Sequence, residues 1–193
     1  VKRVHTELGG KAANVVLPDA DFAVHLPPTV QGIVANSGQS CIAPTRILVH
    51  KDRESEAVGF VKAYLEAVPV GDPMTEGPHI GPTLFSGVTP DMRIAQEEVF
   101  GPVATLMTYA DEDEAVRVAN DTPFGLSMTI SGDPAKAALL APKMRAGIVT
   151  INSWGPDAGA PFGGYKQSGN GRENGVYGLR EFMEVKSVIG APV

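Results

Sequence analysis

The sequence has 193 residues, of which 43% are hydrophobic and 20% charged, values typical of a folded, water-exposed domain. A net charge of −6 without any lysine or arginine run excludes a basic nucleic-acid-binding surface, and no apolar run approaches the ~18 residues of a membrane span. A single cysteine excludes an internal disulfide, and residues 1–5 do not resemble a signal peptide. We therefore expect a cytoplasmic protein with neither a membrane nor a nucleic acid as partner.

Short apolar or alternating runs follow one another along the chain and are separated by segments with helical spacing. Strands are predicted, in chain order, over residues 1–6, 12–17, 46–50, 103–109, 126–131, 147–151 and 185–189. Helices are predicted over residues 30–36, 53–68, 134–145 and 173–182, and also after the capping residues Asp21 and Asp111. The alternation predicts an α/β domain, with a mostly parallel sheet and flanking helices.

Pro27 and Pro28 interrupt the helical pattern that begins after Asp21. Proline lacks a backbone N–H and clashes with the preceding turn of a helix. We therefore expect the helix to stop at this pair or a new helix to start at Thr29.

Cys41 is the first candidate for chemistry, because a thiolate is the strongest nucleophile among the side chains. Most free cysteines are small buried apolar residues, and that interpretation competes here. Cys41, however, follows a predicted turn at Gly38-Gln39-Ser40, where a backbone N–H can also donate to an oxyanion. An unperturbed thiol has a pKa of about 8.5, so catalysis requires a base or a local dipole.

Glu7 lies 34 positions before Cys41 and precedes the pair Gly9-Gly10. Taken alone, it reads as a solvated carboxylate at the end of a strand. The two glycines allow backbone or ligand to approach closely. A thiol that captures a carbonyl and a carboxylate that activates water would form an acyl-transfer pair.

Two further clusters remain open to two interpretations each. Glu97 and Glu98, followed by Phe100, form either a plain helix-to-strand junction or a carboxylate site for sugar hydroxyls. Residues 153–171 form either a flexible glycine-rich loop or a channel walled by apolar side chains such as Trp154, Phe162 and Tyr165.

Other patterns do not support a site. The four histidines lack metal-ligand spacing, so no metal is expected. Gly169-Asn170-Gly171 resembles the start of a dinucleotide fingerprint, but Asn174 stands where its third glycine belongs.

Taken together and in order, the four clusters resemble the sequence motifs of the aldehyde dehydrogenase superfamily over essentially the whole chain. Residues 7–11 are similar to its glutamate motif, and residues 38–41 are similar to its cysteine motif at a matching spacing. Residues 97–103 resemble its cofactor-ribose motif. Asn152 and residues 161–169 resemble its C-terminal signature.

The resemblance implies oxidation of a small-molecule aldehyde to a carboxylic acid with NAD or NADP. Cys41 would form a thiohemiacetal and then a thioester, and Glu7 would activate the water that hydrolyses it. Glu98, Phe100 and Gly9 would lie at the cofactor.

The resemblance also implies that Trp154 and Phe162 line the substrate channel. Residues 1–182 would form the catalytic domain. Residues 183–193 would carry a C-terminal strand suited to oligomerisation, so a homo-oligomer is expected.

Two departures from the family pattern qualify this expectation. No residues correspond to the long N-terminal cofactor-binding region of the family. Pro82 runs directly into Thr83, where the family has several tens of residues, so we expect an internal truncation at about 82/83. An inactive or partner-dependent fragment is therefore the first alternative, and a thiol hydrolase that uses His50 as its base is the second.

Overall fold

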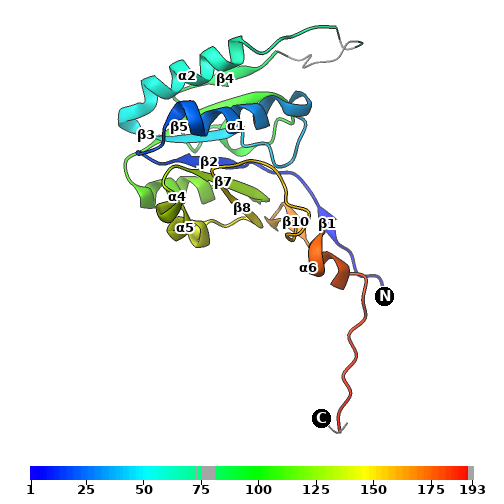
Figure 1. The fold of residues 1–193 in the computed structure, drawn as a ribbon. Coiled ribbons are helices and arrows are strands. Elements are labelled where there is room, and N and C mark those ends of the chain that lie inside the picture. Colours follow the sequence, from blue (N-terminus) through cyan, green and yellow to red (C-terminus); the bar gives the residue numbers. More distant parts are fainter. Residues whose placement is uncertain (73, 75–80, 191–193) are drawn as a thin grey trace.

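The computed structural model describes residues 1–72, 74 and 81–190, and its centre is a six-stranded sheet (Figure 1). The strands lie in the order β4 (Thr83–Phe85), β5 (Val103–Tyr109), β3 (Arg46–His50), β2 (Ala13–Val16), β7 (Ser127–Ser131) and β8 (Ile148–Ile151). Every neighbouring pair in this order is parallel. The predicted α/β fold with a parallel sheet is confirmed.

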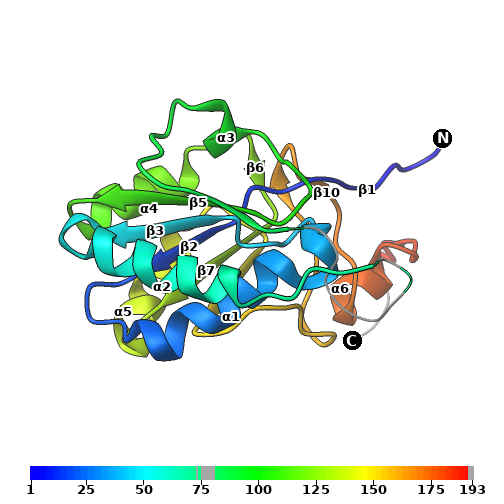
Figure 2. The ribbon, with the colours of Figure 1, turned by 90° about the horizontal axis from the view of Figure 1, so that it is seen from above.

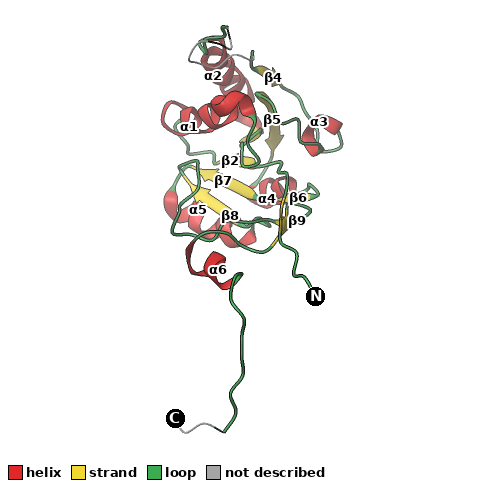
Figure 3. Ribbon diagram, turned by 90° about the vertical axis from the view of Figure 1, so that its right-hand side faces the viewer, coloured by secondary structure: helices red, strands yellow, loops and turns green. Residues whose placement is uncertain are grey.

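Helices cover both faces of the sheet, because successive side chains of each buried strand point to opposite faces. On one face, α1 (Phe22–Val34) and α2 (Glu54–Glu66) pack over a core that includes Val16, Ile47 and Leu106. Figure 2 shows these two helices lying over the strands. On the other face, α4 (Glu112–Asn120) and α5 (Pro134–Leu140) lie over a core that includes Val15, Leu48 and Met107 (Figure 3).

Two short antiparallel pairs lie outside the main sheet, and both involve the C-terminal part of the chain. β1 (Thr6–Glu7) pairs antiparallel with β10 (Gly169–Asn170), and β6 (Phe124–Gly125) pairs antiparallel with β9 (Tyr165–Lys166). The predicted strand over residues 1–6 is thus reduced to Thr6 and its neighbour, since only these residues have a partner strand. The remaining elements are α3 (Arg93–Gln96), α6 (Gly175–Arg180) and the 3-10 turns η1 (Ala35–Gly38), η2 (Lys51–Arg53) and η3 (Ala141–Lys143).

Aspartate side chains start three of the helices. Asp21 accepts a hydrogen bond of 2.9 Å from the backbone N–H of Ala23, as the sequence predicted. Asp111, also predicted, accepts from the Glu114 N–H at 2.8 Å, and Asp133 caps α5 in the same way. Each cap satisfies an N–H that the first helical turn leaves without a partner.

The predicted break at Pro27-Pro28 is wrong, because α1 continues through both residues to Val34. The two prolines remove two backbone hydrogen bonds, which is unfavourable in a helix interior. Leu26, Val30 and Ile33 are completely buried against the sheet and α2. Burial of this apolar face outweighs the lost hydrogen bonds.

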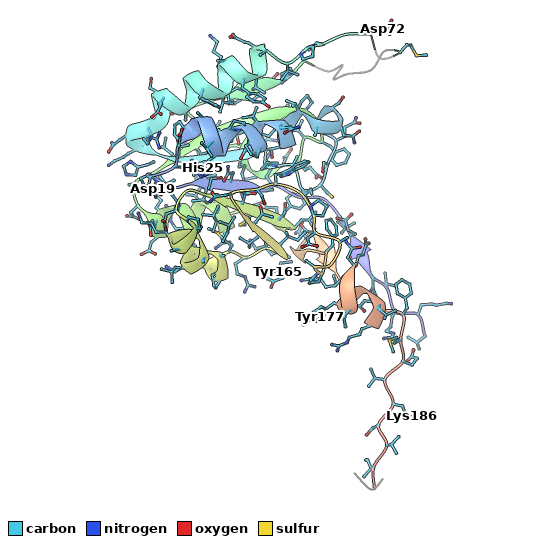
Figure 4. All side chains as sticks on the ribbon, in the orientation of Figure 1. Asp19, His25, Asp72, Tyr165, Tyr177 and Lys186 are labelled. Atoms are coloured by element: carbon cyan, nitrogen blue, oxygen red, sulfur yellow. The ribbon has the colours of Figure 1, made fainter. Side chains whose placement is uncertain are left out.

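The predicted strand over residues 185–189 does not form within the single chain. Residues 184–189 are assigned to no helix or strand, and the chain extends away from the body, where Figure 4 labels Lys186. A strand needs a neighbouring backbone to pair with, and the described part of the chain offers none here. Val185 and Ile189 are 97% and 93% exposed as a result. In residues 1–72, 74 and 81–190, no helix combines the length and apolar character that crossing a membrane requires.

Arg46, at the first position of β3, is completely buried. Its guanidinium donates to the carbonyls of Lys11, Val118 and Ala119 at 2.9, 2.9 and 2.6 Å. The side chain therefore ties the end of α4 to the turn that enters β2. Burial lowers the pKa of Arg46 to about 10, which leaves it charged at neutral pH.

We predict that Arg46→Met lowers the free energy of unfolding by about 3 kcal/mol, because the buried carbonyls of Lys11 and Ala119 lose the guanidinium donor and that of Val118 keeps only the Asp121 N–H. Urea denaturation measures the change. Arg117→Met is the matched control, since Arg117 is exposed and pairs with Glu114, and such pairs contribute about 0–1 kcal/mol. Equal losses in the two variants would contradict this role.

Candidate active site

Three of the sequence motifs meet at the amino edge of the sheet. The turns that carry Gly10, Cys41 and Gly101 lead directly into β2, β3 and β5, which are neighbours in the sheet. The three strands are parallel, and Ala13 and Thr105 lie on either side of Arg46, so the turns that precede the strands must also lie together. Open α/β sheets usually bind ligands at the carboxyl edge, which Asp19 marks in Figure 4. The candidate site lies at the opposite edge of this sheet.

Two glycines allow the turns to touch. A Cβ on Gly10 would collide with the backbone carbonyl of Cys41. Gly38 has a φ of 70°, and a Cβ there would collide with the backbone of Gly101 and Pro102. Neither position tolerates a side chain without movement of the backbone. The cysteine turn is thereby held against both of its neighbours.

Glu98 connects the predicted cofactor cluster to the glutamate motif. Its Oε1 accepts a hydrogen bond of 2.9 Å from the Gly10 N–H, and its Oε2 occupies the space that a Cβ on Gly9 would need. The structure thus brings Glu98 and Gly9 together. Phe100 lies two residues further on with a φ of 56° and remains 51% exposed.

The carboxylate of Glu7 lies close enough to the Cys41 thiol to act on the pKa of the thiol. Burial raises the pKa of Cys41 to about 11, with further contributions from the Glu7 charge, the hydrogen bond to Glu7 and the more distant Glu98 charge. The backbone N–H of Cys41 acts in the opposite direction. The thiol is therefore protonated at neutral pH.

The position of Glu7 is set by the β1–β10 pair. The Leu8 N–H donates to the Ser168 carbonyl at 3.1 Å, which anchors the residue that follows Glu7. The cysteine turn is closed by a hydrogen bond of 3.1 Å from the Ala43 N–H to the Ser40 carbonyl. Two predicted residues far apart in sequence thus face each other from separately anchored turns.

Phe162 and Trp154 lie in different surroundings. Phe162 lines a cavity of about 380 Å³ that Glu7, Arg172 and Glu173 also line. Trp154 does not line this cavity; its indole N–H donates to the Ile42 carbonyl at 3.2 Å. Phe162 and Trp154 as channel residues both stay predictions, and Trp154 in addition contacts the cysteine turn.

Two residues near the site escaped the sequence analysis. Lys11 is 2% exposed, and burial, followed by the nearby Arg46 charge, lowers its pKa to about 8 while Glu98 acts in the opposite direction. Ser127 donates to the Ile42 carbonyl at 3.3 Å. The position of Lys11 just before a buried strand was a usable signal, but nothing in the sequence links Ser127 to Cys41.

His50 does not serve the predicted alternative of a cysteine–histidine pair. It lies at the far end of β3 from the cysteine turn, and its Nε2 lies 3.1 Å from the Ala110 carbonyl. Within the described ranges, no cluster of three or more histidine, cysteine or acidic side chains could hold a metal ion.

The family model for the aldehyde dehydrogenase family matches residues 1–84 and 74–188. The chain belongs to this family. A 3-succinoylsemialdehyde-pyridine dehydrogenase of a Pseudomonas species is 39% identical over 234 residues, covering 98% of this chain and 49% of that protein. The chain spans about half the length of the curated relatives it matches.

Solved aldehyde dehydrogenases share the fold. A cysteine-to-alanine variant of aldehyde dehydrogenase C from Pseudomonas syringae, in complex with NAD+ and octanal, superposes with a TM-score of 0.94. It is 39% identical, with 100% of this chain and 49% of that chain covered. The aldehyde dehydrogenase of Mycobacterium tuberculosis, in complex with NAD+, has a TM-score of 0.90 at 34% identity, covering 98% of this chain and 49% of that chain.

We predict that alkylation of Cys41 by iodoacetamide accelerates about tenfold per pH unit up to a pH near 11, because only the thiolate reacts. Glu7→Gln removes a negative charge beside the thiol, so it lowers the thiol pKa and speeds alkylation at pH 8. Mass spectrometry follows the modification of the single cysteine. Slower alkylation in Glu7→Gln would instead identify Glu7 as the base that deprotonates Cys41. Glu97→Gln is a matched control, since Glu97 pairs with Arg93 on the surface.

Proposed function

We propose that this chain is the catalytic half of an NAD(P)-dependent aldehyde dehydrogenase that oxidises an aldehyde to a carboxylic acid. The proximity of the Glu7 carboxylate to the Cys41 thiol, close enough to raise the pKa of the thiol, is the observation that carries the proposal. A nucleophile beside a potential base is the pair that formation and hydrolysis of a thioester require. Membership of the family and the aldehyde in the related Pseudomonas syringae structure support the same reaction.

In the first step, the Cys41 sulfur adds to the carbonyl carbon of the aldehyde and forms a thiohemiacetal. The attacking species is the thiolate, so the proton of the thiol must leave before or during the addition. The backbone N–H of Cys41 is close to its own sulfur and is a suitable donor to the oxyanion that forms.

The residues around Glu98 fit a cofactor sugar. One oxygen of Glu98 accepts from the Gly10 N–H, and the carboxylate has lone pairs left for further donors such as ribose hydroxyls. Phe100 presents an exposed ring nearby in sequence. Oxidation of the thiohemiacetal to a thioester needs a hydride acceptor, which is the chemistry that a nicotinamide supplies when bound. The NAD+ complexes of related enzymes support this assignment.

In the last step, Glu7 takes a proton from a water molecule, the water oxygen attacks the thioester carbon, and the acid leaves as the thiolate is released. Glu7 is exposed and lines the cavity of about 380 Å³, so water can reach it from that side. Phe162 lines the same cavity and supports an apolar wall beside Glu7.

We further propose that residues 1–182 form the catalytic domain, with an internal truncation at about 82/83. The family model matches in two stretches, and the alignment with the Pseudomonas relative is longer than the whole chain. Both findings support the presence of residues in the relatives that this chain lacks. Residues 75–80, which lead to this junction, lie outside the described residues. A single free cysteine is consistent with the proposed cytoplasmic location.

Residues 183–193 are proposed to pair with a second copy of the chain. Phe182, Val185 and Ile189 are each more than 90% exposed in the single chain. We predict that Val185→Lys combined with Ile189→Lys shifts the protein to monomer in light scattering, because charges would be placed in an apolar contact. Lys186→Gln is the control. An unchanged assembly in the double variant would exclude this segment as the interface.

An activated ester tests the thiol–carboxylate pair without any cofactor. We predict a burst of one nitrophenolate per chain from p-nitrophenyl acetate, followed by slower turnover, because acylation of Cys41 releases nitrophenolate directly. Cys41→Ala should abolish the burst. Glu7→Gln should keep the burst but slow the steady state by about 10²–10⁴-fold, the usual contribution of a general base.

The two phases are separated by stopped-flow absorbance, with Glu97→Gln as the carboxylate control. An unchanged steady-state rate in Glu7→Gln would remove Glu7 from the mechanism. Absence of a burst in the wild-type chain would argue against the catalytic proposal as a whole.

A fragment that retains the pair but binds no cofactor is the second candidate. The observation that favours it is the coverage of only 49% of the related proteins. Calorimetric titration with NAD and NADP separates the two candidates, since the absence of heat at millimolar cofactor supports the fragment.

A further inference from the structure

The carbonyl group of Ile42, the residue after the candidate nucleophile, accepts hydrogen bonds from two side chains. The indole N–H of Trp154 donates to it at 3.2 Å and the hydroxyl of Ser127 at 3.3 Å. The two donors come from different parts of the chain, since Ser127 begins β7 and Trp154 follows β8. We refer to Trp154, Ser127 and the Ile42 carbonyl as the carbonyl clamp.

The indole ring has a fixed place beside α1. A Cβ on Gly32 would lie 2.8 Å from the ring atoms Cδ2 and Cε2 of Trp154, so the ring lies against the bare backbone of the helix. A planar ring confined in this way has few rotamers available. The helix therefore orients the N–H that points at Ile42.

The clamp adds a restraint on the side of the turn that follows Cys41. Ala43 closes the turn by one hydrogen bond to Ser40, and the Cys41 carbonyl is confined by Gly10 on the side of β2. The carbonyl clamp restrains the Ile42 carbonyl through Ser127 on β7 and through Trp154. Cys41 is thus held between two independent restraints, one on its own carbonyl and one on the next.

We propose that Trp154, assisted by Ser127, is a positioning residue that holds the Cys41 turn so that the thiol faces Glu7. The indole acts through the Ile42 carbonyl and does not touch the reacting atoms. This role differs from that of a substrate-channel wall, because it requires the hydrogen bond to the Ile42 carbonyl and no contact with substrate. The inference rests on the proposed function, in which Cys41 is the nucleophile, but the first measurement that tests it does not depend on catalysis.

Trp154 is the single tryptophan, so growth with a tryptophan analogue changes this position alone. Benzothienylalanine has nearly the shape of tryptophan but carries sulfur in place of the N–H. Its incorporation removes the donor while it keeps the ring against Gly32. Trp154→Phe and Ser127→Ala provide genetic versions of the same loss, and Tyr177→Phe on the exposed helix α6 is the control for loss of an aromatic polar group.

The first readout is the pH profile of Cys41 alkylation. Loss of the clamp frees the thiol from Glu7 and from burial, so we expect the midpoint to move from about 11 toward the ordinary thiol value of about 8.5. The second readout is the ester assay, in which we expect the steady state to slow about three- to tenfold, the equivalent of one hydrogen bond. Ser127→Ala should show a smaller shift in the same direction.

Urea denaturation of each variant completes the experiment. A shifted alkylation midpoint with unfolding close to wild type supports the positioning role. An unchanged midpoint overturns it, whether or not stability falls, because the N–H would then serve only the fold. If the wild-type chain shows no ester burst, the proposed function fails, and the alkylation profile still decides whether the clamp positions the thiol.

Discussion

The close approach of three turns at the amino edge of the sheet is the constraint on which the site depends. Adjacent parallel strands in register bring the turns together, and Gly10 and Gly38 remove the side chains that would keep them apart. Motifs separated by dozens of residues thus become one surface. The placement of Cys41 and Glu98 follows from strand order, and the placement of Glu7 follows from the separate β1–β10 pair.

The electrostatics of this surface are unfavourable for a thiolate in the chain alone. Two carboxylates, Glu7 and Glu98, lie near a partly buried sulfur, and both raise its pKa. Lys11 is buried and close enough to Glu98 for that carboxylate to raise the pKa of Lys11. Lys11 nevertheless does not offset the rise in the pKa of Cys41. The Cys41 thiol becomes more nucleophilic when a positive charge binds near it or when Glu7 is neutralised, because either change lowers the pKa of the thiol. The reactivity of the thiol therefore depends on which groups are bound beside it.

Much of the fold could be predicted from the sequence because its signals are local. The buried strand over residues 46–50 and the caps Asp21 and Asp111 depend only on patterns within a few residues. Pro27-Pro28 misled the prediction because burial of α1 against the sheet, a tertiary effect, outweighs helix propensity. The strand over residues 185–189 misled it because β pairing needs a second backbone, which a strand pattern alone does not guarantee.

Within the site, the sequence could identify groups but not the contacts between them. Residue type and resemblance pointed to Cys41, Glu7 and Glu98, and the structure brings these three together. For Trp154, composition indicated only an aromatic side chain in a loop, which fits a channel wall equally well. The distinction lies in one N–H that meets the Ile42 carbonyl across 112 residues of sequence, and in a glycine on α1 that makes room for the ring. Long-range hydrogen bonds of this kind leave no periodic pattern, so a residue that positions a nucleophile is recognised only once the fold is known.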